Sequence, residues 1–216
     1  MTKEKQMTTE IDTGLLERLR EGVRESLPEV ALIEDEHLRD QVVDVHARAL
    51  AETRFERIED IPPTGVPDSP PMRQGTQADH YRATTTMAVG LARGMQAVLP
   101  HVEIDYDVLV AAALTHDVGK AYEYEHWDRW EDNRARTGSP SLRHPAYGAH
   151  LGLLVGLPEP VVHCIAVHSY MAEGSFVRAS LETTIVQYAD AAFWTMLDAG
   201  GHLEGEIDID AVNRRA

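Results

Sequence analysis

Cysteine is almost absent from this 216-residue chain, in which Cys164 is the single example. One cysteine excludes an intrachain disulfide and leaves no set of thiolates for iron–sulfur chemistry. Chains without disulfides are typical of reducing compartments, so we expect a cytoplasmic protein.

Long apolar runs and an excess of basic residues are also missing. No stretch approaches the roughly 18 uncharged apolar residues that a membrane-spanning helix needs. The first residues, Met1 to Gln6, are polar and contain no apolar core of a signal peptide. The formal net charge is −16, whereas binding to a phosphate backbone needs clustered lysine and arginine. We therefore expect neither a membrane nor a nucleic acid as partner.

The motifs of several common enzyme classes are absent as well. The chain has no Gly-x-Ser-x-Gly motif of a serine nucleophile, no phosphate-binding Gly-rich loop and no dinucleotide fingerprint. A small phosphorylated or carboxylated substrate is compatible with the acidic composition, because bound metal ions and a few local cations override the global field.

The hydrophobic pattern that is present predicts an all-α fold. Apolar residues recur at helical spacing in seven segments, and no segment alternates as a strand does. The predicted helices span residues 12–27, 29–58, 76–100, 105–115, 145–156, 158–171 and 178–199. Five prolines among residues 61–71 interrupt regular structure, and residues 121–143 have the polar and aromatic composition of an excursion or lid.

A histidine and an aspartate stand side by side where the most apolar of these helices ends. Residues 105–115 are apolar on nearly every face, which predicts a buried central helix, and His116-Asp117-Val118-Gly119-Lys120 follows directly. An imidazole and a carboxylate can bind one divalent cation together, or the carboxylate can bridge two. Gly119 permits a sharp turn, and Lys120 can meet an anion. The run therefore predicts a metal-centred active site.

Four further candidates for metal ligands occur on other apolar helices or helix ends. His80 lies early in its helix, His144 precedes a proline at a helix start, and His168 follows an apolar run. Asp190 interrupts an apolar segment in which an unpaired carboxylate would be costly. Together with the His-Asp pair, these residues could fill the coordination positions of two metals.

This order of residues resembles the HD-domain superfamily of metal-dependent phosphohydrolases. The resemblance rests on the His116-Asp117-x-Gly119-Lys120 core, on His144-Pro145-x-x-Gly148 and on Ile165-x-x-His168, and it covers about residues 76–195. We expect residues 1–71 to form N-terminal helices and a Pro-rich linker packed on the domain, and residues 72–216 to form an HD-type metal-binding domain. The implied fold is a helical bundle with a metal site in its core.

The resemblance also implies which residues bind metal. His80, His116, Asp117 and Asp190 would hold a first ion, and Asp117 would bridge to a second ion on His144 and His168. Histidine-rich ligand sets favour Fe, Mn, Zn, Co or Ni over Mg. The expected cofactor is therefore one or two divalent transition metals.

The reaction expected from such a site is hydrolysis of a small soluble substrate, in the first place a phosphate ester. A metal-activated hydroxide at the His/Asp site, with Asp117 as the catalytic bridge, would attack the substrate. Lys120 would offset the charge that builds in the transition state, and Lys120, Tyr122 and Arg143 would contact the substrate.

Two other functions stay open at this point. One branch of the superfamily uses the same ligands for a mixed-valent di-iron oxygenase that cleaves a small polar substrate. A non-catalytic, ligand-binding HD module is a lesser alternative. The acidic N-terminal helices and the Pro-rich linker could serve docking or the formation of a homo-oligomer.

The remaining polar candidates receive weaker interpretations. Asp79 is a hypothetical partner that orients His80 by a hydrogen bond. The other histidines are interpreted as packing, surface or loop residues without a role in the site: His37, His46, His101, His126, His150, His163 and His202.

Overall fold

The structure, a computed structural model, describes residues 11–64, 69–125, 142–169 and 180–205. These segments contain α-helices and short 3-10 turns, and their one β-type pairing is an isolated bridge between Met72 and Leu203. The predicted all-α fold is confirmed. The predicted lid over residues 121–143 lies mostly outside the described residues.

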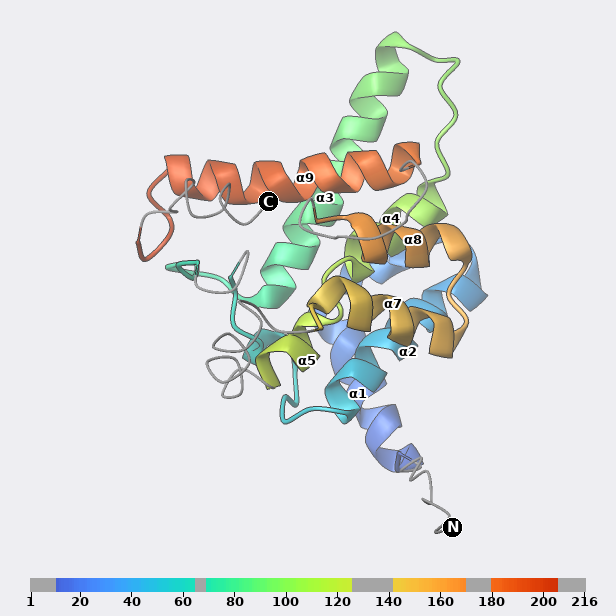
Figure 1. The fold of residues 1–216 in the computed structure, drawn as a ribbon. Helices are drawn as coiled ribbons and strands as arrows, with labels where there is room; N and C mark the ends of the chain where they lie inside the picture. The colour runs from blue at the N-terminus through green and yellow to red at the C-terminus, as the bar shows by residue number, and fades with distance from the viewer. Residues whose placement is uncertain (1–10, 65–68, 126–141, 170–179, 206–216) are drawn as a thin grey trace, which may run out of the picture.

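The helices are mostly short and pack together into a bundle (Figure 1). They are α1 (Thr13–Ser26), α2 (Glu36–Ala51), α3 (Gln77–Val98), α4 (Tyr106–Thr115), α5 (Lys120–Glu125), α7 (His144–Val155), α8 (Glu159–Val167) and α9 (Leu181–Ala199), with 3-10 turns η1 (Pro28–Leu32) and η2 (Ile58–Asp60).

Several helix starts are set by side chains that cap the free N–H groups of the first turn. Asp12 accepts from Leu15 N in α1, Thr76 accepts from Asp79 N in α3, and the carboxylate of Asp105 accepts from Val108 N in α4. These starts agree with the predicted helices at residues 12–27, 76–100 and 105–115.

The predicted helix over residues 29–58 is wrong. The chain instead forms η1 after Leu27, starts α2 at Glu36 and ends it at Ala51. Asp35 explains the break, because its carboxylate accepts from the backbone N–H groups of His37 and Leu38 and so caps a new helix. The periodic apolar residues on both sides of this break pack into the same core, which is why the pattern looked continuous.

Helix α4 occupies the centre of the bundle. It contacts α2, α3, α8 and α9, and residues 109–115 are all buried, as its apolar composition predicts. In Figure 1, α9 crosses α3 on one side of the molecule, while α1 and α2 lie towards the opposite side. The C-terminal end of α4, which is followed by His116 and Asp117, therefore lies in the middle of the packed helices.

Gly119 is required for a close approach rather than for a strained turn. The chain does turn at residues 116–119, but Gly119 does not adopt a positive φ there. A Cβ at Gly119 would overlap the carbonyl oxygen of His144 and would lie 2.7 Å from Gly148 N. The lack of a side chain lets the turn after α4 press against the start of α7.

None of the described helices combines the length and the apolar character needed to cross a lipid bilayer.

Candidate metal centre

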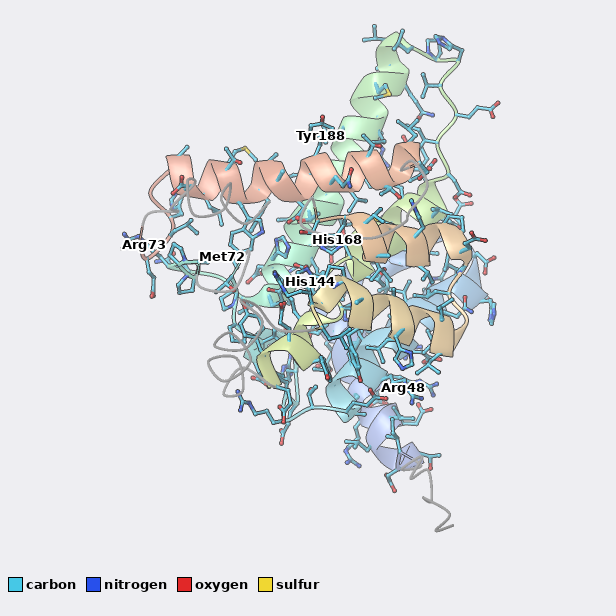
Figure 2. The ribbon with its side chains drawn as sticks, viewed as in Figure 1. Arg48, Met72, Arg73, His144, His168 and Tyr188 are labelled. Carbon is cyan, nitrogen blue, oxygen red and sulfur yellow. The ribbon has the colours of Figure 1, made fainter. Side chains whose placement is uncertain are left out.

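The structure brings the six predicted ligands together from five helices or helix ends. His80 comes from α3, the His116-Asp117 pair from the end of α4, His144 from the start of α7, His168 from the end of α8 and Asp190 from α9. They form two groups, and within each group one ligand atom per residue lies within 4.8 Å of the others. The first group is His80, His116 and Asp190, and the second group is Asp117, His144 and His168. Figure 2 shows His144 and His168 next to each other in the interior.

Asp117 lies between the two groups and offers one oxygen to each. Its Oδ2 is 3.2 Å from Nε2 of His80 and 3.4 Å from Nε2 of His116. Its Oδ1 is 3.2 Å from Nε2 of His144 and 3.3 Å from Nε2 of His168. A carboxylate placed in this way can bridge two cations.

The histidine rings are held so that Nε2 faces the centre. Nδ1 of His116 lies 2.7 Å from the carbonyl oxygen of Ala113, and Nδ1 of His168 lies 2.9 Å from that of Ile165. Because a carbonyl only accepts, each Nδ1 carries a proton, and in the neutral ring Nε2 keeps its lone pair for a metal.

The close contacts inside each group fit a cation. Nε2 of His80 and Nε2 of His116 are 3.1 Å apart, and those of His144 and His168 are 3.3 Å apart. Two such nitrogens can face each other only with a proton or a cation between them. Oδ1 of Asp190 is buried without a hydrogen-bond partner and lies 3.4 Å from Nε2 of His80. The donor set of imidazole nitrogens and carboxylate oxygens is the one that divalent transition metals prefer.

The electrostatics of the centre favour an ionised Asp117. Burial on its own would raise the pKa of this carboxyl, but the charges of Lys120 and His116 hold the pKa well below its usual range. Burial lowers the pKa values of His80 and His168, which keeps these two rings neutral, as ligands must be. Burial alone would also lower the pKa of His116, but the attraction of Asp117 outweighs it and raises that pKa.

Lys120 is buried in the centre rather than exposed on the surface. Its Nζ lies 2.7 Å from Oδ2 of Asp117 and 2.6 Å from the carbonyl oxygen of Thr64, and it sits 5.6 Å from the ring centroid of Trp194. The ammonium group therefore touches the carboxylate of Asp117 directly. Its contact with substrate stays a prediction.

The two other predicted substrate contacts pair with residues that are not candidate metal ligands. Tyr122 stacks on Tyr147 with ring centroids 3.8 Å apart, and Arg143 forms an ion pair with Glu123. Their roles towards a substrate stay predictions.

One sequence-based hypothesis is wrong. Asp79 does not orient His80: its carboxylate accepts from the backbone N–H and the hydroxyl of Thr76 and closes the capping box of α3. Of the histidines given no role in the site, His37, His101, His150 and His202 are exposed, whereas His126 lies outside the described residues.

Three residues that contact the centre or its support were missed. Glu123 accepts from Nδ1 of His144 at 2.7 Å, Gln77 donates to Oδ2 of Asp117 at 3.4 Å, and Nε2 of His46 donates to the carbonyl oxygen of Leu114 at 2.8 Å. His46 had a signal in the sequence, because it falls on the apolar stripe of its helix. Glu123 and Gln77 had none, because a glutamate or a glutamine on a helix is ordinarily exposed.

A comparison with protein-family models matches residues 78–194 to the HD domain. The match covers more than half of the chain and contains all six residues of the two groups. The protein therefore belongs to the HD-domain family, whose members are mostly metal-dependent hydrolases. Searches of curated proteins and of solved structures gave no match.

Proposed function

We propose that this protein is a metal-dependent hydrolase of a small soluble substrate, in the first place a phosphate ester, with a centre for two divalent transition metals. The observation that carries the proposal is the placement of Asp117, whose two carboxylate oxygens face two separate pairs of imidazole nitrogens.

The ligands of each ion follow from the two groups. His80, His116 and Asp190 would hold one ion and His144 and His168 the other, with Asp117 shared between them. When bound, such ions lower the pKa of water to near neutrality and polarise the bond to be cleaved.

Counting its contacts with the described residues, Lys120 has one donor left for the reaction. An ammonium group has three N–H donors, and the contacts with Asp117 and Thr64 use two of them. The third can donate to an oxygen that gains negative charge as the substrate reacts. Because Lys120 is buried beside the centre, this interaction is weakly screened by solvent.

A mixed-valent di-iron oxygenase is the second candidate. The observation that favours it is the ligand set itself: four histidines and two aspartates, arranged around one bridging carboxylate, suit iron. A non-catalytic module that binds a small molecule is less well supported, because such a module would not need all six candidate metal-binding residues.

Metal content separates these candidates. The protein is purified without added metal, its metals are measured by plasma mass spectrometry, and EPR spectra are recorded before and after partial reduction. Manganese, zinc, cobalt or nickel without a mixed-valent signal supports the hydrolase, and phosphate esters are then screened as substrates. About two irons per chain with a mixed-valent signal contradicts it in favour of the oxygenase, and oxygen uptake is then measured.

A further inference from the structure

The second metal group has a buried carboxylate directly behind it. Glu123 on α5 has a side chain only 2% exposed. Its Oε2 accepts from Nδ1 of His144 at 2.7 Å, and its Oε1 accepts from Nε of Arg143. We propose that Glu123 is a positioning residue, which fixes the ring of His144 and thereby sets the metal affinity of the group Asp117, His144 and His168. This inference rests on the two-metal centre of the proposed function.

The positions of three histidines in their helices explain why His144 needs a hydrogen-bond acceptor from another helix. His116 and His168 lie at the C-terminal ends of α4 and α8, and each donates its Nδ1 proton to the carbonyl oxygen three residues earlier. His144 is the first residue of α7, so no earlier turn of its own helix offers a carbonyl. Glu123 supplies the missing acceptor from another helix.

A charged acceptor does more than a carbonyl can. A carboxylate that accepts from Nδ1 fixes the tautomer in which Nε2 is free, and its negative charge makes Nε2 a better metal ligand. Arg143 holds the other oxygen of Glu123, so Oε2 stays directed at His144. Glu123 thus acts through His144 and need not contact the metal.

The two groups differ in the carboxylates that lie near them. Asp117 is common to both, and the first group has Asp190 as a carboxylate of its own. The second group has no other carboxylate among its described ligands, and Glu123 places a negative charge behind one of its imidazoles. Arg143, which pairs with Glu123, offsets part of that charge, so the hydrogen bond from Nδ1 of His144 to Glu123 is the contact on which the positioning role depends.

The test is a calorimetric titration of the metal-free full-length protein with Mn²⁺, followed by EPR of the loaded protein. We expect the wild type to bind two ions, with a spin-coupled spectrum from the bridged pair. Glu123→Ala should weaken one of the two binding events by about 100-fold and leave the other nearly unchanged. Its EPR spectrum at one equivalent should then be the six-line signal of an isolated Mn²⁺.

Two further variants separate positioning from folding. Glu123→Gln keeps the volume and one acceptor but loses the charge, so the loss should be about 10-fold. Glu125→Gln is the matched control: it removes the same charge from the same helix, where Glu125 accepts from the backbone N–H of Arg54, and it should bind both ions as the wild type does.

These measurements separate failure of the proposed role of Glu123 from failure of the proposed two-metal centre. If the wild type binds fewer than two ions, the two-metal centre is wrong and the role of Glu123 falls with it. If the wild type binds two and folded Glu123→Gln also binds both with unchanged affinity, the role of Glu123 alone is overturned, even where Glu123→Ala does not fold.

Discussion

The side chains that form the candidate centre and some of those that support it come from different regions of the chain. All six candidate ligands lie within residues 78–194, the region that matches the HD domain. His46 on α2 and Thr64 in the Pro-rich segment lie outside that region. Nevertheless, His46 donates to the carbonyl oxygen of Leu114, two residues before His116, and Thr64 accepts from Lys120.

The difference between the two regions is one of role. The matched region contributes the candidate metal ligands. The N-terminal region pairs with two groups beside them, the carbonyl oxygen of Leu114 and the ammonium group of Lys120. An unsatisfied buried polar group costs about 1–3 kcal/mol. The expected boundary at residues 71 and 72 stays a prediction, but these two contacts cross it.

The largest effect is expected from the residue that joins both metal groups. Asp117→Ala removes the carboxylate that the two groups share, so the protein should lose both metals and all hydrolytic activity. Plasma mass spectrometry and an activity assay check this outcome. Asp40→Ala, which removes a mostly exposed carboxylate paired with Arg24, is the control and should retain both. A fully active Asp117→Ala variant would rule out the proposed centre.

Lys120 connects the two regions, and its replacement tests that connection. Lys120→Met leaves Asp117 as a buried carboxylate without its cation, which should cost the metal-free protein about 3–5 kcal/mol. Bound metal ions would neutralise Asp117 themselves, so the loss should be clearly smaller in the loaded protein. Urea unfolding with and without Mn²⁺ measures both values.

The control for this prediction is a partly exposed cation. Arg82→Met breaks a partly exposed ion pair with Glu29 and should cost less than about 1 kcal/mol in either state. Equal losses for Lys120→Met with and without metal would contradict the contact between Lys120 and the metal-bridging carboxylate.

Gly119 tests the close packing within the matched region. Gly119→Ala should destabilise the protein by about 3 kcal/mol, because the new Cβ meets backbone atoms of His144 and Gly148 that cannot rotate away. A Cβ added at Gly90 on α3 would point into open space, so Gly90→Ala should stabilise by about 0.5–1 kcal/mol. Thermal unfolding compares the two, and similar effects would contradict the assigned role of Gly119.

His46 tests the support from the N-terminal region through pH. Burial lowers the pKa of His46 to about 4, below the value of about 6.5 in an unfolded chain. The folded state therefore binds fewer protons, so this contribution to stability is complete above pH 6.5 and is lost as the pH falls towards 4. The loss should reach about 2 kcal/mol at pH 5 and about 3 kcal/mol below pH 4.

The variant for this measurement keeps the hydrogen bond but cannot titrate. His46→Gln can still donate to the carbonyl oxygen of Leu114, so its free energy of unfolding should fall less steeply than that of the wild type between pH 6.5 and 4. His150→Gln, at an exposed position, should follow the wild type. Parallel curves for the wild type and His46→Gln would contradict the burial of a neutral His46.

The sequence predicted the fold class and most of the helices because both depend on local patterns. The buried character of α4 followed from its apolar composition, and the predicted starts near residues 12, 76 and 105 coincide with the residues that cap α1, α3 and α4. The break at Asp35 was not predicted, because apolar spacing continues across it. The predicted helix was therefore too long, but none of the six candidate ligands lies in it.

The candidate ligands were predicted because their residue types and their order along apolar helices are unusual. Histidine and aspartate in buried positions need partners, and that requirement is visible in the sequence. The supporting residues were harder to predict. Glu123, Gln77 and Thr64 are ordinary residues whose function depends only on what the fold places beside them.

The sequence by itself therefore predicted an all-α protein of the HD-domain type with a histidine- and aspartate-rich candidate metal centre at the end of a buried helix. Periodicity and residue chemistry are local properties, and the family was expected from a resemblance in the order of a few residues, so neither needs the tertiary structure. Only the tertiary structure decided that the two oxygens of Asp117 face different pairs of histidines. It also decided that Glu123 accepts a hydrogen bond from His144 and that Thr64 accepts one from Lys120. These contacts join residues far apart in the chain, and their distances are fixed by how the helices pack.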